Sequence, residues 1–338
     1  MGTIRIISAD EVRQIFTLPM ALEAVEKAYL QKYHGQGAVW PMVSHEFDPG
    51  HADMDIKSGH LSTEGIFGLK LVSWFDTNPD RGLPGLYGTS IICDMATGQP
   101  QALLNAGPIT ALRTGAAGAI GAKYLARPDS RNLVMVGCGS LSACLTAATL
   151  LALPGITAVT LVNPHHPEKA AAMLHDFQSK INNLLADAGI TTSAAIHAST
   201  DIPAAIRSAD VILTATPAHA PIIESAWVQP GTHISCVGAD MSGKQELDAQ
   251  IFAHARVFGD DLRQCLTAGE CEQAAKAGLI STLTAEIGAV IAGETPGRTA
   301  PDDVTIFDST GIALQDLASA AVILKQARQL GMGETATL

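Results

Sequence analysis

The sequence predicts an α/β protein of two domains, one of them built on a doubly wound parallel sheet. Three observations support this fold class. From residue 132 onward, short apolar segments alternate with helical ones, which indicates a parallel sheet covered on both faces. Residues 40–94 instead contain short β-prone segments separated by turns, typical of an antiparallel sheet. The length of 338 residues is sufficient for both domains.

Composition narrows the class of function. Hydrophobic residues make up 47% and charged residues 16%, which fits a well-packed chain rather than a disordered one. The formal net charge is −12 and no basic stripe is present, so we expect neither a nucleic-acid nor an anionic-membrane partner. The start of the chain lacks the apolar core of a signal peptide, and no apolar run is long enough to span a membrane, so we expect a cytoplasmic protein.

The cysteines and histidines show no metal-binding spacing, so no metal site is expected. No CxxC pair is present, and several of the cysteines lie in or beside apolar segments. We therefore expect free, buried thiols rather than disulfides. The six cysteines are Cys93, Cys138, Cys144, Cys236, Cys265 and Cys271.

The N-terminal third begins with one predicted helix. Ser8 and Glu11 have the spacing of a capping box, and apolar residues at helical spacing continue to Tyr33. Strands are then predicted at residues 68–74 and 88–94, with turns at 78–82 and 96–98 between and after them. A Gly/Ala-rich helix is predicted over residues 109–126, and Pro128 prevents its continuation.

From residue 132 onward, the sequence predicts alternating strands and helices. A long helix is expected at residues 167–185, and another closes the chain after residues 308–311. Buried strands are expected at residues 133–136, 159–162, 209–214, 233–237 and 256–259, and residues 304–307 lead into the segment 308–311.

The segment from Val134 to Ser142 predicts a dinucleotide-binding site of the Rossmann type. A buried strand ends in Gly137-x-Gly139 and a helix follows. Gly137 permits the tight turn, and Gly139 lets the backbone approach a pyrophosphate at the helix N-terminus. Ser142 stands where a third glycine is common, and it is small enough for close packing. An ordinary turn is the alternative, but the strand–turn–helix context favours the cofactor site.

The residues after the second strand do not select the cofactor clearly. A carboxylate there would favour NAD and an Arg would favour NADP. The chain instead has Asn163-Pro164-His165-His166, with no acid before Glu168. Asn163 is able to bind either form, and the histidines are either tolerant of a 2′-phosphate or ordinary loop residues. We expect NAD(H), with a slight preference, and NADP(H) as the alternative.

Lys57, Lys70, Arg113 and Asp240 are the candidate residues for chemistry. Lys70 lies in an apolar β-prone segment, and Arg113 near the start of an otherwise uncharged helix, where an Arg is able to clamp a carboxylate. The alternatives are a solvent-facing strand residue for Lys70 and a structural ion pair for Arg113. Asp240 directly follows a parallel strand, a good place for acid–base work, with a loop or capping carboxylate as the alternative.

Five segments, in this order along nearly the whole chain, resemble the ornithine cyclodeaminase/mu-crystallin family. The most specific is the last. They are Gly68-Leu69-Lys70, Leu112-Arg113-Thr114-Gly115-Ala116-Ala117, Gly137-Cys138-Gly139, Gly238-Ala239-Asp240 and the run Thr305-Ile306-Phe307-Asp308-Ser309-Thr310-Gly311 with Ile312-Ala313-Leu314-Gln315-Asp316-Leu317-Ala318.

The resemblance implies a homodimer with a substrate-binding and dimerisation domain of α+β type at residues 1–114 and 308–338, and a Rossmann domain at residues 115–307. It implies that Lys70 and Arg113 contact the substrate and that Asp240 is the catalytic carboxylate. The cofactor-binding residues that we expect are Thr114, Gly137, Gly139, Ser140, Leu141, Asn163, His165, Thr216, Gly238, Ser309, Thr310 and Gly311.

One departure from the family concerns the carboxylate-binding residues. Many members have an Arg shortly after the position of Pro41, whereas this chain has Met42-Val43-Ser44-His45, and Lys57 is the expected substitute. Three segments resemble the iminosuccinate reductase branch most, a branch that makes aspartate from an imino dicarboxylate. They are residues 55–59, 163–165 and 243–248.

The activity that the resemblance implies is NAD(P)H-dependent reduction of a small imino acid, or of a keto acid plus ammonia, to an amino acid. Iminosuccinate, ketimine and alanine dehydrogenase-type reactions are the expected forms. One alternative is NAD-dependent cyclodeamination of ornithine or a similar diamino acid, a lyase reaction. The alternative of another class is a protein that binds NADPH and a small ligand without turnover, like the mu-crystallins.

Overall fold

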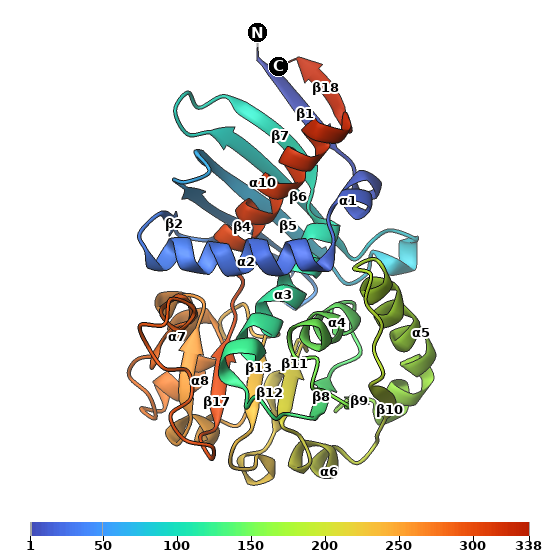
Figure 1. Cartoon of the computed structure of the whole chain (residues 1–338), viewed down its shortest axis with the longest axis vertical. Helices are drawn as coiled ribbons and strands as arrows, with labels where there is room; N and C mark the ends of the chain where they lie inside the picture. The colour runs from blue at the N-terminus through green and yellow to red at the C-terminus, as the bar shows by residue number, and fades with distance from the viewer. Residues whose placement is uncertain (1, 49, 338) are drawn as a thin grey trace. The chain divides into compact units, whose positions relative to one another are not determined.

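The structure, a computed structural model, describes residues 2–48 and 50–337 and divides into two compact units. The N/C unit comprises Met1–Arg113 and Ile312–Leu338, and the central unit comprises Thr114–Gly311 (Figure 1). The boundaries expected from the sequence, 114/115 and 307/308, differ from these by one residue and by four. None of the helices in the described part of the chain has the length and apolar character needed to cross a bilayer.

The N/C unit contains the predicted antiparallel sheet. Its strands follow the order β18-β1-β7-β6-β5-β4-β2, with β3 also paired to β4. All neighbours from β2 to β7 are antiparallel, whereas β1 pairs with β7 in parallel. The strands are β1 (Thr3–Ile7), β2 (Gly37–Val39), β3 (Val43–Asp48), β4 (Ala52–Leu61), β5 (Ile66–Phe75), β6 (Leu86–Asp94), β7 (Pro100–Asn105) and β18 (Glu334–Thr337).

The single helix expected between Ser8 and Tyr33 is wrong, because the chain forms two helices there. They are α1 (Ala9–Ile15) and α2 (Leu18–Tyr33), and Phe16 and Thr17 between them are extended. Pro19 lies in the first turn of α2, where its missing N–H is harmless, but it would break a continuous helix. The capping box of Ser8 and Glu11 is confirmed at the start of α1.

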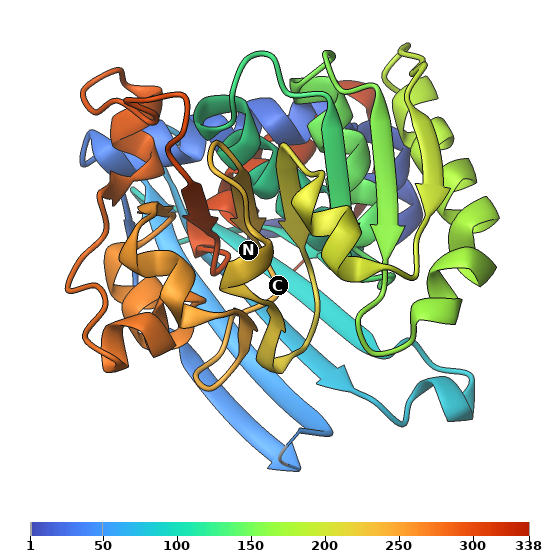
Figure 2. The same cartoon turned by 90° about the horizontal axis from the view of Figure 1, so that it is seen from below.

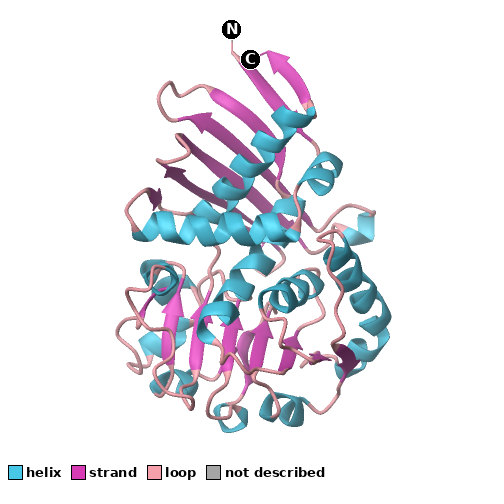
Figure 3. Ribbon diagram, viewed as in Figure 1, coloured by secondary structure: helices cyan, strands magenta, loops and turns pink. Residues whose placement is uncertain are grey.

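One face of this sheet is covered by helices. α10 (Ala313–Leu330) packs against β4, β5 and β6, and against α2 (Figure 3). Two cross-strand glycines let α10 approach the sheet: a methyl group on Gly59 or Gly68 would lie 3.2 or 3.0 Å from Leu314 or Leu317. The side chains that share this face with the two glycines are therefore held under α10.

The central unit contains the predicted parallel sheet, with strand order β10-β9-β8-β11-β13-β17-β15-β16. All of its pairings are parallel. The order reverses between β8 and β11, the position at which doubly wound sheets bind ligands. The strands are β8 (Asn132–Val136), β9 (Ala158–Val162), β10 (Ala195–Ala198), β11 (Val211–Thr214), β13 (His233–Cys236), β15 (Arg256–Gly259), β16 (Ala285–Glu286) and β17 (Thr305–Asp308).

The doubly wound class and all five predicted strands are confirmed, whereas β17 and the edge strands β10 and β16 were not predicted. Figure 2 shows the strands side by side, with α5 alongside β9 and β10. α3 (Gly107–Leu125) begins in the N/C unit and ends in the central unit. The other elements are α4 (Ser142–Ala152), α5 (Pro167–Ala186), α6 (Ile202–Arg207), α7 (Leu262–Ala268), α8 (Cys271–Lys276), α9 (Ile287–Ile291), and the paired strands β12 (His219–Ile223) and β14 (Gln245–Leu247).

Candidate functional site

Two predicted substrate cations are neighbours on adjacent strands of the N/C unit. Lys57 on β4 lies directly opposite Lys70 on β5, and Lys70 lies opposite Ser90 on β6. The side chains of such a row lie on one face of the sheet. The three residues are only 5%, 1% and 1% exposed. The alternative of a solvent-facing Lys70 is therefore wrong.

The third cation, Arg113, meets Lys70 through an aspartate at the start of α10. Asp316 Oδ1 is 3.0 Å from Lys70 Nζ and 3.2 Å from Arg113 Nε. Arg113 Nη1 also donates to Gln315 Oε1 at 2.9 Å, and Gln315 Nε2 donates to the Tyr29 hydroxyl at 2.7 Å. Arg113 thus forms an ion pair with Asp316, which was the alternative to a role in binding a carboxylate. The same Asp316 oxygen also pairs with Lys70.

Asp316 was missed as a site residue, although it lies in the most specific family-like segment. Its pairing with Lys70 joins residues 246 positions apart, so no local spacing signals it. The only signal in the sequence is an acid within an Ala/Leu-rich helix.

Burial changes the proton affinities of this cluster. Burial, together with the positive charges of Arg113 and Lys57, lowers the pKa of Lys70 to about 7, although Asp316 acts in the opposite direction. Burial acts to raise the pKa of Asp316, but the charges of Arg113 and Lys70 outweigh it and lower that pKa. One Asp316 oxygen thus contacts two cations, Lys70 and Arg113.

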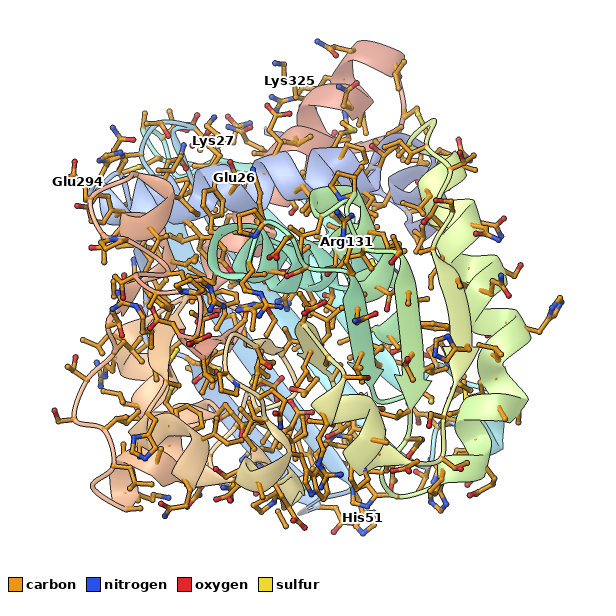
Figure 4. The ribbon with its side chains drawn as sticks, turned by 60° about the horizontal axis from the view of Figure 1, so that its bottom comes forward. Glu26, Lys27, His51, Arg131, Glu294 and Lys325 are labelled. Atoms are coloured by element: carbon orange, nitrogen blue, oxygen red, sulfur yellow. The ribbon has the colours of Figure 1, made fainter. Side chains whose placement is uncertain are left out.

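Most charged side chains of this protein are more exposed to solvent than Lys57, Lys70 and Arg113. The charged residues that Figure 4 labels are half-buried or exposed, as surface ions usually are. They are Glu26, Lys27, His51, Arg131, Glu294 and Lys325. Lys57, Lys70 and Arg113 are therefore unusual for this chain, because a buried cation costs free energy unless a partner or ligand compensates it.

The glycine turn of the central unit has the geometry that a dinucleotide needs. Gly137 has a φ of 110°, a conformation in which a side chain would be strained, and its N–H donates to the Val162 carbonyl at 2.9 Å. A methyl group on Gly139 would meet no atom of the protein within 4 Å. Ser142 begins α4 and its hydroxyl donates to the Gly139 carbonyl at 2.8 Å.

A small pocket adjoins this turn within the central unit. It is lined by residues of the turn, of the first turn of α4 and of α5, among them Cys138, Gly139, Ser140, Ser142 and Phe177. Leu141, the residue before α4, is half-buried. Open space at Gly139 next to the N-terminus of α4 fits a phosphate group.

The loop after β9 is ordered by Asn163. Its side-chain carbonyl accepts hydrogen bonds from the backbone N–H groups of His165 and His166, at 3.2 and 3.1 Å. His165 is exposed, and His166 Nδ1 lies 3.5 Å from Glu168 Oε1. Asn163 therefore shapes the turn, and cofactor contacts of Asn163 and His165 stay a prediction.

Thr216 and Gly238 are held by a buried glutamate that sequence reasoning missed. The Glu246 carboxylate accepts from Thr216 N at 2.7 Å, Thr216 Oγ1 at 2.8 Å and Gly238 N at 3.0 Å. The Glu270 carboxylate in turn accepts from the backbone N–H groups of Glu246 and Leu247. Burial raises the pKa of both glutamates.

A second buried acid organises the segment Ser309–Gly311. The Asp260 carboxylate accepts from the hydroxyls of Ser309 and Thr310, at 3.1 and 2.9 Å, and from Gly311 N at 2.8 Å. Asp308, next to this segment, is fully buried, and burial raises its pKa to about 7. Thr114, in α3, is also buried.

Asp240 lies just beyond the end of β13, where the sequence placed it. Its carboxylate accepts a hydrogen bond from Lys244 Nζ at 2.6 Å, and its side chain is 40% exposed. It is thus a partly solvated carboxylate beside a cation, unlike the enclosed acids of the same unit. The cysteines are free thiols, as predicted, and all except the half-buried Cys93 are buried.

Comparisons with known proteins agree with this architecture. A model of the ornithine cyclodeaminase/mu-crystallin family matches residues 4–330. The alanine dehydrogenase of Archaeoglobus fulgidus is 37% identical over 97% of this chain and 96% of its own length. The iminosuccinate reductase of Paracoccus denitrificans is 33% identical over 97% of this chain and 98% of its own.

Solved structures give the same result. A dimeric archaeal alanine dehydrogenase with bound NAD has 36% sequence identity and a TM-score of 0.87, with complete coverage of both chains. Sequence, motif order and fold therefore agree along the whole chain, which belongs to the ornithine cyclodeaminase/mu-crystallin family.

Proposed function

We propose that this protein reduces a small 2-imino acid to the amino acid with a nicotinamide dinucleotide. The imino acid is either a cyclic imine or the product of a 2-keto acid and ammonia. The observation that carries the proposal is the buried cluster of Lys57, Lys70 and Arg113, which suits a carboxylate. Relatives named for alanine and iminosuccinate support an amino or imino acid as its ligand.

The cofactor would be held by the glycine turn of the central unit. A pyrophosphate would fit the open space at Gly139 and the N-terminus of α4. It would also fit the tight turn at Gly137, whose positive φ would be strained for any residue with a side chain. The bound NAD of the archaeal relative supports NAD(H) as the cofactor. When bound, the nicotinamide supplies or accepts the hydride.

The cofactor site is tested by titrating NADH and NADPH into the wild type and Gly139→Val, with fluorescence as the readout. Valine would fill the space at Gly139, so the variant should bind either cofactor at least tenfold more weakly, roughly 1.4 kcal/mol or more. Equal affinity would exclude this turn as the site.

The substrate roles follow from charge and position. Arg113, with its planar fork of donors, would grip the substrate carboxylate with the help of Lys57. Lys70 would stabilise charge that develops at the carboxylate or the nitrogen. Asp240 would exchange a proton with the substrate nitrogen, a role that rests on the family resemblance and on its partly solvated carboxylate.

A screen of substrates by absorbance at 340 nm tests the proposed reaction. Pyruvate, oxaloacetate and cyclic imines are each supplied with NADH, the keto acids with ammonia. Net consumption of NADH is the expected result. Release of ammonia from ornithine with no net change at 340 nm would indicate cyclodeamination instead. Tight binding of NADPH with no turnover of any substrate would indicate a binding protein.

We also propose that the uncovered face of the N/C sheet pairs with a second copy of the chain. Leu71 points away from the face that holds Lys70, and it is 40% exposed. Two further large apolar side chains, Val43 of β3 and Tyr87 of β6, are exposed, and the strand register places them on the same face as Leu71. An exposed apolar face suits an interface between proteins, and the archaeal relative is a dimer.

Light scattering at micromolar concentration tests this assembly. The wild type should have the mass of a dimer, and Leu71→Lys should shift it towards the monomer. Lys325, which is exposed on α10, offers a control position, and Lys325→Glu should remain dimeric. A monomeric wild type would overturn the proposal.

A further inference from the structure

The environment of Asp316 contains one feature that an ordinary ion pair does not explain. Oδ1 alone receives both Lys70 Nζ and Arg113 Nε, while Oδ2 is buried without a hydrogen-bond partner among the described residues. A buried carboxylate is normally saturated with donors, because each unmet oxygen costs free energy. Here the carboxylate joins two cations at one point instead.

The position of this carboxylate is fixed by the fold on three sides. Asp316 lies in the first turn of α10, where the helix dipole favours a negative charge. Gly59 and Gly68 let that turn approach the sheet that carries Lys70. Gln315, the preceding residue, links Arg113 to the Tyr29 hydroxyl.

Stability alone does not account for such a cluster. A buried ion pair is commonly no more stabilising than apolar side chains of the same volume, and the neighbouring residues of α10, Leu314 and Leu317, are apolar and buried. The ion pairs with Asp316 instead bring Lys70 and Arg113 to the same oxygen atom, beside Lys57 on the neighbouring strand.

We propose that Asp316 is a positioning residue for the reaction: its carboxylate holds the Lys70 ammonium and the Arg113 guanidinium at one point, so that both meet the same carboxylate of the substrate. This inference rests on the proposed function, because it requires that Lys70 and Arg113 bind that substrate. A misplacement of such groups by about 1 Å is enough to reduce a rate by roughly 10²-fold.

The charge of Asp316 has a second consequence, for Lys70. The groups around Lys70 include Lys57 from β4, Ser90 from β6, Arg113 and the Thr110 hydroxyl from α3, and Asp316 from α10. The two cations disfavour the ammonium form, and the Asp316 carboxylate favours it. Loss of that carboxylate should therefore lower the pKa of Lys70 further, and the enzyme should lose Lys70 charge at a lower pH.

Asp316→Asn and Asp316→Glu separate these two effects. The full-length variants are assayed with the substrate found in the screen, between pH 5.5 and 9, and NADH affinity is measured in parallel. Asp316→Asn should raise KM by roughly 10- to 100-fold and move the alkaline fall of kcat/KM to lower pH. Asp316→Glu keeps the charge but displaces it, so it should raise KM while the alkaline limb stays near its wild-type position. NADH affinity should change less than twofold in both.

Ser319→Ala is the matched control. Ser319 is buried one turn later on α10, and its hydroxyl donates to the Gln315 carbonyl within the helix at 2.8 Å. It should leave KM and the pH profile unchanged. A wild-type KM and alkaline limb in Asp316→Asn, or an equal loss in Ser319→Ala, would overturn the inference.

A double variant keeps the test valid if Asp316→Asn does not fold. Lys70→Met with Asp316→Asn removes both charges together and is compared with Lys70→Met. Its KM should be higher than that of Lys70→Met, because Asp316 also positions Arg113, whereas its pH profile should be the same, because Lys70 is absent from both. A KM equal to that of Lys70→Met would overturn the inference. The wild-type rate tests the proposed function separately. If the wild type were not a reductase, calorimetric titration of an amino acid into the NAD+-loaded protein would decide on Asp316, and equal affinities of wild type and Asp316→Asn would overturn its role.

Discussion

The two units bury charge in opposite ways. The N/C unit encloses Lys57, Lys70 and Arg113 around the Asp316 carboxylate, whereas the central unit encloses Glu246, Glu270, Asp260 and Asp308. The central acids are bound mainly by backbone N–H groups and hydroxyls. Their pKa values are raised by burial, while that of Asp316 is lowered by its cations.

Under the proposed function, this difference separates charge that binds a ligand from charge that holds loops in place. The carboxylates Glu246 and Asp260 fix the loops at Thr216, Gly238 and Ser309–Gly311. In the N/C unit, Lys70 and Arg113 contact the side chains of Asp316 and Gln315. The proposed function gives these cations a second role, in which they bind the substrate, because a buried charge costs free energy unless a partner or ligand compensates it.

The largest effect is expected at Asp240, which belongs to neither class of buried charge. Asp240→Asn should reduce kcat by roughly 10²- to 10⁴-fold, the usual contribution of general acid–base catalysis, and leave NADH affinity intact. Steady-state kinetics and NADH titration measure both quantities. Asp302→Asn, at an exposed acid of the same unit, is the control. Full kcat in Asp240→Asn would make Asp240 a loop carboxylate.

The next largest effect is expected at Lys57, which should distinguish a substrate with two carboxylates from a substrate with one. Lys57→Ala should raise KM for oxaloacetate plus ammonia roughly tenfold more than for pyruvate plus ammonia, about 1.4 kcal/mol of selective loss, because a diacid needs another cation. Arg113→Ala should raise KM for both substrates. Equal sensitivity of the two substrates to Lys57→Ala would show that Lys57 does not read the second carboxylate.

Asp308 provides a test on the central side of the comparison. Its pKa is raised from 3.8 to about 7 by burial, so the folded protein binds a proton that the unfolded chain releases between these values. The contribution of Asp308 to the free energy of unfolding is therefore full below pH 4 and falls as the pH rises to about 7.

Asp308→Asn should accordingly stabilise the protein at pH 8 and much less at pH 5. The shift corresponds to roughly 4 kcal/mol at most. Urea denaturation followed by tryptophan fluorescence at the two pH values measures the difference. A change that is equal at both pH values would contradict the raised pKa of Asp308.

The smallest effect is expected for two buried serines, one in each unit. The Ser90 hydroxyl has no hydrogen-bond partner among the described residues, whereas the Ser235 hydroxyl donates to the Gly118 carbonyl at 2.8 Å. Ser90→Ala should raise the free energy of unfolding by about 1 kcal/mol, and Ser235→Ala should lower it by about the same. Thermal melts of both variants test the contrast, and destabilisation by Ser90→Ala would mean that its hydroxyl is already satisfied.

The sequence by itself determined those features that depend on neighbours along the chain. Apolar runs between turns predicted β5 and β6 of the N/C sheet and five strands of the central sheet, and Gly137 and Gly139 predicted the turn between β8 and α4, because a strand, a positive φ and a helix start are local properties. Ser8 and Glu11 predicted the cap of α1. The break between α1 and α2 was also readable, from Thr17 and Pro19, but the helical spacing on both sides concealed it.

Only the tertiary structure decided which charges meet. Lys70 and Asp316 are 246 residues apart, and they meet because β5 and α10 pack together where Gly68 leaves room. The sequence likewise could not show that Glu246 and Asp260 hold the loops of Thr216 and Gly311. Residue type tells whether a side chain is able to carry charge, but its burial and its partners depend on packing between distant segments, and these set its pKa and its role.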